Sequence, residues 1–163
     1  MDLYEFELKD LLLTAIKSEI ESNRLYKKIA NKTKNGLLQN KLKFLAEEED
    51  KHREYIEDIY KNHYPKNKIK IPDQTAVPLP DIKIDEDMPV SSMLQMAMDA
   101  EKNAKEFYTG LAQRFEDGSK IHNTLMYFAD MEQGHYKMME MEKESMEKFE
   151  ESDVYWPMMH VGP

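Results

Sequence analysis

Two stretches, LKFLAEEEDKH at residues 42–52 and LMYFADMEQGH at residues 125–135, decide the fold of this chain. Both place Leu, Ala, Glu and His at the same four positions, so the second repeats the first at an offset of 83 residues. Residues three or four apart lie on one face of an α-helix. Each stretch therefore predicts a helix whose apolar face is interrupted by Glu-x-x-His.

Two further stretches repeat each other at an offset of 82 residues, LTAIKSEIESNRLY at 13–26 and AMDAEKNAKEFY at 97–108. Each carries one Glu on an apolar helical face, Glu19 or Glu101, with a Tyr seven residues later on the same face. The nearly constant offset indicates an internal pseudo-twofold axis. We expect it to bring all four Glu and both His to one level of a bundle.

The helix breakers are clustered, and five of the seven prolines lie between Pro65 and Pro89. Helices are predicted over residues 5–33, 37–63, 92–116 and 119–150, with Ser92 and Gln95 as a capping box for the third. Short connections make each pair of helices an antiparallel hairpin, and a crossover of about residues 64–91 joins the hairpins. The predicted fold class is all-α, a four-helix bundle.

The crossover contains the pieces KIKI and DIKI, which either form short strands or run extended with isolated Ile side chains on the bundle. The bundle is expected to span residues 1–151. Residues 152–163 are expected to form an apolar tail, including Trp156, that packs on the bundle or on a partner subunit.

Composition limits the function. The 163 residues include no Cys and carry a net charge of −9, which excludes disulfides and Cys-held metals and argues against nucleic acid as a partner. The acidic N-terminus does not resemble a secretory signal, and no apolar run is long enough for a membrane span. We therefore expect a cytoplasmic protein without a membrane partner.

The Glu residues on the apolar faces need a positive partner. Two Glu-x-x-His matches are weak evidence alone, and the acidic stretch near Glu49 could be a solvated face. However, buried unpaired carboxylates are costly, and no Lys or Arg shares their helical faces. One Glu from each of two helices with Glu-x-x-His from the other two is the dinuclear carboxylate pattern of four-helix bundles. The predicted metal ligands are Glu19, Glu49, His52, Glu101, Glu132 and His135.

Two divalent ions would balance the four carboxylates, and an oxide or hydroxide bridge would balance two trivalent ions. Carboxylates with imidazoles suit Fe or Mn, and Zn stays open. Glu49 and Glu132 are expected to bridge the ions. Small side chains at Ser22 and Ala104 leave space where an oxidant could enter. Tyr26 and Tyr108 either donate hydrogen bonds to carboxylate ligands or fill core space.

At these residues the chain resembles the rubrerythrin branch of the ferritin-like superfamily, over about residues 8–145. The resemblance implies two iron ions (Fe²⁺/Fe³⁺) held by the six ligands named above. It also implies reduction of hydrogen peroxide in defence against oxidative stress, and a homodimer. Full-length rubrerythrins add a Cys-rich rubredoxin-like domain, so a chain without Cys is expected to take electrons from a separate donor such as a rubredoxin.

Typical rubrerythrins place another Glu where this chain has Ala104, which leaves a six-ligand site closer to that of bacterioferritin. The sequence therefore leaves two alternatives open. One is a ferroxidase that handles iron with O2, and the other is a metal-binding bundle without catalysis.

Overall fold

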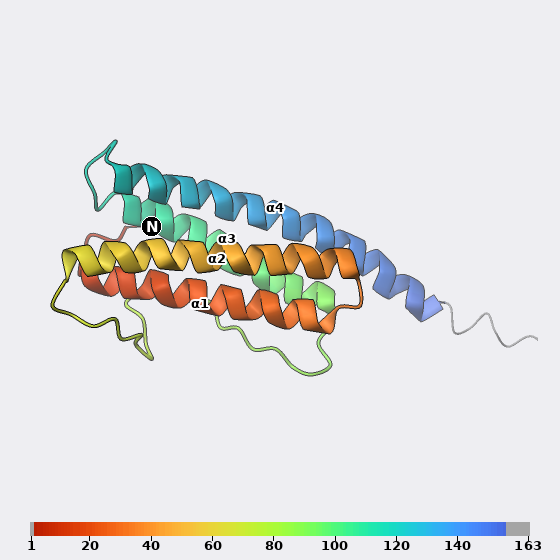
Figure 1. Ribbon diagram of the computed structural model, residues 1–163. Helices are drawn as coiled ribbons and strands as arrows, with labels where there is room; N and C mark the ends of the chain where they lie inside the picture. The colour runs from red at the N-terminus through yellow and green to blue at the C-terminus, as the bar shows by residue number, and fades with distance from the viewer. Residues whose placement is uncertain (1, 156–163) are drawn as a thin grey trace, which may run out of the picture.

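Four α-helices account for the regular structure of the computed structural model, which describes residues 2–155 and side chains through residue 150. They are α1 (Leu8–Lys32), α2 (Gly36–His63), α3 (Val90–Ala112) and α4 (Lys120–Tyr155). Figure 1 shows them side by side as a bundle, with α1 and α2 antiparallel and α3 and α4 antiparallel. The prediction of an all-α four-helix bundle built from two hairpins is confirmed.

The crossover between α2 and α3 runs along the outside of α1, from one end of the bundle to the other (Figure 1). Lysine ammonium groups of α1 donate hydrogen bonds to its carbonyl oxygens: Lys17 to Pro72 and Asp73, Lys28 to Ile84, and Lys32 to Glu86. No described crossover residue forms a strand. Ile69, Ile82 and Ile84 pack against the bundle, so the extended alternative for KIKI and DIKI is correct.

Several helices begin or end at residues other than the predicted ones. The Asn35 side chain accepts hydrogen bonds from the amides of Leu37 and Leu38 and so caps α2. The capping box at Ser92 is wrong, because α3 begins two residues earlier, after Pro89, and that N-cap makes no side-chain hydrogen bond. The end of α4, at Tyr155, lies five residues beyond the predicted one.

The N-terminal segment replaces the predicted first turn of α1. The guanidinium of Arg114 donates hydrogen bonds to the carbonyls of Leu3, at 2.8 Å, and Phe6, at 2.7 Å. These bonds hold residues 3–6 against the chain just after α3, which ends at Ala112 instead of continuing to residue 116. The backbone of Glu7 is extended, and α1 begins at Leu8.

The apolar core has two parts. One cluster contains Leu12 and Ile16 of α1 with Ile56 and Ile59 of α2, and the other contains Leu25 and Ile29 of α1 with Leu42 and Leu45 of α2. Along both helices the predicted polar residues lie between the two clusters. Each hydrophobic cluster therefore closes one side of a polar layer inside the bundle.

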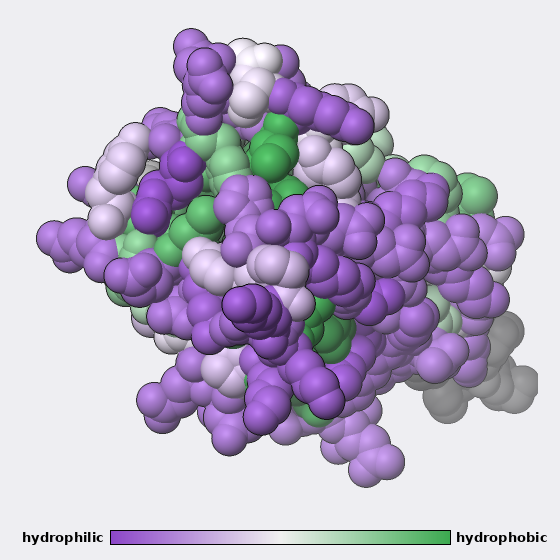
Figure 2. All heavy atoms as spheres, turned by 60° about the vertical axis from the view of Figure 1, so that its left-hand side comes forward, coloured by the Kyte–Doolittle hydropathy of each residue, from purple (hydrophilic) through white to green (hydrophobic). Residues whose placement is uncertain are grey.

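The surface is strongly hydrophilic, as Figure 2 shows for one face, with hydrophobic residues visible only between polar ones. This fits a chain in which 34% of residues are charged. Within residues 2–155, none of the helices combines the length and the apolar character that crossing a membrane requires. The predicted contacts of Trp156 and the following residues lie outside the described part of the chain.

Candidate metal centre

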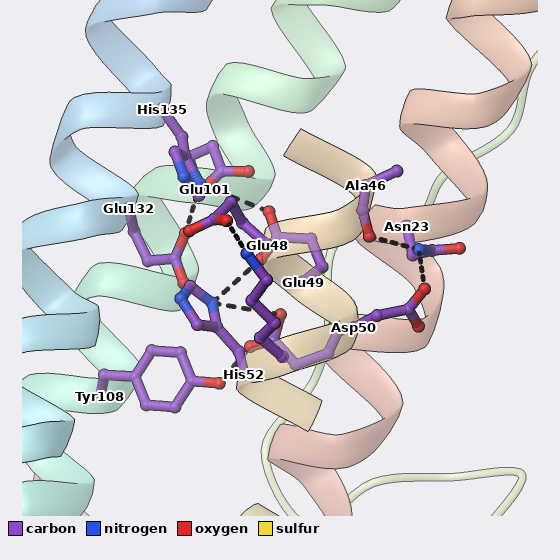
Figure 3. Close-up of polar contacts among 12 residues, drawn as sticks. Asn23, Ala46, Glu48, Glu49, Asp50, His52, Glu101, Tyr108, Glu132 and His135 are labelled. Atoms are coloured by element: carbon purple, nitrogen blue, oxygen red, sulfur yellow. Dashed lines mark hydrogen bonds and ion pairs between the residues drawn. The ribbon is translucent and has the colours of Figure 1, made fainter. Parts of the chain in front are cut away.

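All four helices contribute to the polar layer. Glu19 comes from α1, Glu49 and His52 from α2, Glu101 from α3, and Glu132 and His135 from α4. None of the six side chains is more than 7% exposed. Figure 3 shows five of them, all except Glu19, converging inside the bundle. The structure thus brings together every residue that the sequence predicted as a ligand.

The six residues form two overlapping groups. Glu19, Glu49, His52 and Glu132 each offer one ligand atom, and these atoms lie within 4.8 Å of one another. Glu49, Glu101, Glu132 and His135 do the same. Two ions could occupy these groups, with Glu49 and Glu132 shared between them as the predicted bridges.

The two imidazoles face the shared carboxylates. Nδ1 of His52 lies 3.1 Å from an oxygen of Glu49 and 3.1 Å from one of Glu132. Nδ1 of His135 lies 3.3 Å and 3.0 Å from the other oxygens of the same two carboxylates. The arrangement is therefore close to symmetric about the Glu49 and Glu132 pair.

Despite these short distances, most polar atoms of the layer lack a hydrogen-bond partner. Neither oxygen of Glu49, Glu101 or Glu132 has one in the described structure, and neither do Nδ1 of His52 and of His135. A buried carboxylate without partners is strongly disfavoured, so a cluster of such groups in a native structure requires an explanation such as a bound ion. Metal coordination would satisfy all of these atoms together, so the donor set fits a pair of hard divalent ions.

Burial and mutual repulsion raise the pKa of two of the four carboxylates. Burial, followed by the charges of Glu49 and Glu132, raises the pKa of Glu19 well above its usual range. Burial and the charge of Glu132 likewise raise the pKa of Glu101. Without a metal, the layer must therefore take up protons to limit the repulsion.

The two imidazoles take up some of these protons, because their pKa values are raised. Burial alone would lower the pKa of His52, but its contacts with Glu132 and Glu49 raise it to about 9. Contacts with carboxylates raise the pKa of His135 above its usual range in the same way, against the effect of burial. Conversely, burial would raise the pKa of Glu132, but its contacts with His135 and His52 lower it below the usual range. A protonated His pair thus occupies the electrostatic role that metal ions would take.

The two tyrosines predicted beside the ligands behave differently. Tyr108 donates a hydrogen bond from its phenol to Glu19, and burial and the charge of Glu19 raise its pKa, so it stays protonated. The hydroxyl of Tyr26 is fully buried and has no hydrogen-bond partner in the described structure. Tyr108 therefore fits the predicted ligand-supporting role, and Tyr26 fits the alternative of filling core space.

The remaining described histidines lie elsewhere. Nδ1 of His63 contacts the carbonyl oxygen of Ile59 at 2.9 Å near the end of α2, and His122 lies 3.6 Å from Asp117. Neither belongs to the groups that could hold a metal.

Residues flanking the layer were not predicted. Asn23 of α1 donates hydrogen bonds to the carbonyl of Ala46 and to Asp50 of α2 (Figure 3). Lys105 of α3 donates one to Gln133 of α4. The repeat contained a signal for these pairs, because Lys105 and Gln133 stand at the repeat positions of Asn23 and Asp50.

Comparison with known proteins agrees with this architecture. A sequence model of the family described as Rubrerythrin matches residues 10–151. Among solved structures, a hypothetical protein from Pyrococcus furiosus is similar, with 32% sequence identity and a TM-score of 0.79. The match covers 90% of this chain and 94% of that one. No curated protein matches the chain.

Proposed function

This chain belongs to the rubrerythrin family, and we propose that it is a non-haem di-iron oxidoreductase that reduces hydrogen peroxide to water. The observation that carries the proposal is the sharing of Glu49 and Glu132 between two buried four-residue groups. The carboxylates and imidazoles lie at ion-pair distance from each other, but most of their polar atoms have no hydrogen-bond partner in the described structure, which metal coordination would supply.

Bound iron would supply one electron per ion, and the two electrons with two protons convert one peroxide molecule into two water molecules. The protein's own contribution is to hold four carboxylates and two imidazoles in one layer. The two apolar clusters exclude water above and below it. Tyr108 fixes the orientation of Glu19 by its phenol hydrogen bond.

The electrons must come from outside these 163 residues. With no Cys, the chain cannot hold the iron of a rubredoxin-type centre. We propose a separate redox protein, such as a rubredoxin, as the donor. The homodimer and the cytoplasmic location stay predictions.

Ferroxidase activity is the second candidate. The observation in its favour is Ala104, which offers no ligand where typical rubrerythrins place another Glu, so each metal group has four residues and the two are equivalent. Such a centre would oxidise ferrous iron with O2. A bundle that binds metal without turnover is the third candidate.

One kinetic experiment separates the three. The metal-free protein is loaded anaerobically with ferrous iron and mixed in a stopped-flow instrument with hydrogen peroxide or with O2, while iron oxidation is followed by absorbance. We expect two irons per chain and faster oxidation by peroxide. Faster oxidation by O2 would replace the proposal with the ferroxidase, and oxidation by neither would favour the non-catalytic bundle.

A further inference from the structure

A pocket of about 280 Å³ lies between α3 and α4 and reaches the polar layer. Two of the candidate ligands, Glu101 and Glu132, form part of its wall. The other lining residues are Lys102, Lys105, Glu106, Gln133 and Tyr136. Because Lys102 and Glu106 are exposed and the two ligands are buried, the pocket connects the surface with the layer.

One hydrogen bond spans this pocket. Nζ of Lys105 donates to the side-chain oxygen of Gln133 at 2.7 Å, and so links α3 to α4 beside the ligands. Both side chains are half-buried, flexible and not otherwise hydrogen-bonded in the described structure. Such a contact can open and close without any movement of the helices.

The equivalent position of the other hairpin is sealed. Asn23, at the repeat position of Lys105, is only 8% exposed. Its amide donates to the backbone carbonyl of Ala46 at 2.6 Å and to Asp50 at 3.0 Å. Ile20, at the repeat position of Lys102, packs against the apolar core. A buried short side chain bound to backbone cannot swing aside as a lysine can.

The space predicted beside Ala104 is closed as well. The cavity there has a volume of only about 20 Å³, and none of the six candidate ligands lines it. Val77, Pro78 and Leu79 of the crossover and Phe107 of α3 cover it. The cavity beside Ala104 is therefore not one that reaches the ligands. Ser22 does not line it, and an oxidant path beside Ser22 stays a prediction.

We propose that small neutral or anionic molecules reach the metal centre through the α3/α4 pocket, and that the Lys105–Gln133 bridge gates it. The inference rests on the proposed function, since it assumes that metal occupies the layer. The lining carries both signs of charge, with the ammonium groups of Lys102 and Lys105 beside the carboxylate of Glu106. Hydrogen peroxide, which is neutral and water-sized, therefore meets no electrostatic barrier there.

Because the chain has no Cys, a single introduced thiol can be labelled selectively, and the label can block the pocket reversibly. In a Lys105→Cys variant the new thiol is unique, so benzyl methanethiosulfonate places an aromatic group in the pocket, and a phosphine reductant removes it. The protein is loaded with Co²⁺ before labelling, and azide binding to the metal is followed by visible absorbance. This readout does not depend on turnover.

We expect labelling of the Lys105→Cys variant to slow azide binding by about tenfold or more, and the reductant to restore it. The unlabelled variant should bind azide at least as fast as the native protein, because the bridge is missing. A Gln133→Cys variant, whose thiol approaches the pocket from α4, should behave in the same way. Lys27→Cys, on the exposed surface of α1, is the matched control and should be unaffected by its label.

Azide binding that is unchanged by labelling of the Lys105→Cys and Gln133→Cys variants, or slowed equally by labelling of Lys27→Cys, would overturn the gate. Failure of the native protein to take up Co²⁺ would overturn the metal centre and the gate together. By contrast, a metal-loaded protein that does not reduce peroxide but loses azide binding on labelling would contradict only the proposed reaction, and the gate would stand.

Discussion

The two hairpins of the bundle are alike at their centre and different at their edges. Glu19, Glu49 and His52 of the first correspond to Glu101, Glu132 and His135 of the second, and all six meet in one buried layer. At the flanks the first hairpin has the buried Asn23 and the second has the half-buried Lys105. The difference teaches that the repeat preserves the candidate ligands, while the positions that flank them differ in side-chain type and burial between the two hairpins.

The largest expected effect is the loss of metal binding when a carboxylate common to both ligand groups is removed. Glu132→Ala and Glu49→Ala should both fail to bind two metal ions, with a loss in affinity of about 100-fold or more, because each carboxylate serves both groups. Metal content per chain after dialysis, measured by mass spectrometry, checks this. Glu140→Ala, an exposed change on α4, is the control and should keep both ions. A Glu132→Ala protein that still held two ions would disprove the ligand assignment.

An effect of comparable size is expected when the pH changes the folding stability of the metal-free protein. The folded-state pKa of His52 is about 9, above the ordinary 6.5, so its protonation stabilises the fold fully below pH 6.5. That stabilisation, about 3 kcal/mol, is lost as the pH rises through 9. The raised pKa values of Glu19 and Glu101 act in the same direction, because the folded state again binds more protons.

Urea unfolding at pH 6.5 and pH 9.5, with chelator or with Co²⁺, measures this dependence. The metal-free protein should be less stable at the higher pH, and the metal-loaded protein should lose less, because metal replaces the protons. Equal stability of the metal-free protein at both pH values would show that the layer does not hold the excess protons.

The smallest effect compares the two tyrosines. Tyr108→Phe removes the hydrogen bond to buried Glu19 and should lower the free energy of unfolding by about 1–3 kcal/mol. Tyr26→Phe removes a buried hydroxyl that has no partner and should be neutral or stabilising. Urea unfolding of both variants beside the native protein tests the difference. Equal destabilisation would mean that the two tyrosines serve the layer alike.

Much of the centre was predictable from sequence. Core-facing positions recur every three to four residues, so a Glu or His in such a series must face inward wherever the helix lies. This periodicity identified all six candidate ligands, and the repeat showed that they share one level. The proline cluster between Pro65 and Pro89 similarly placed the crossover between α2 and α3.

Helix ends and the fine structure around the layer depended on distant contacts. Arg114 donates hydrogen bonds to the segment just before α1, although it lies more than 100 residues away in sequence. The repeat made Tyr26 and Tyr108 look equivalent, and only the three-dimensional arrangement distinguishes the bonded phenol from the unpartnered one.

The sequence by itself determined a Cys-free all-α chain with six inward-facing Glu and His side chains as candidate ligands, because helical periodicity and residue chemistry are local properties. The tertiary structure placed Glu49 and Glu132, the bridges expected from sequence, in both ligand groups. Only the tertiary structure decided that the crossover covers Ala104 and that the pocket opens beside Lys105. The physical reason is that the cover over Ala104 and the opening of the pocket form where the surfaces of different segments meet. Their outcome depends on how closely those surfaces approach, which no single segment encodes.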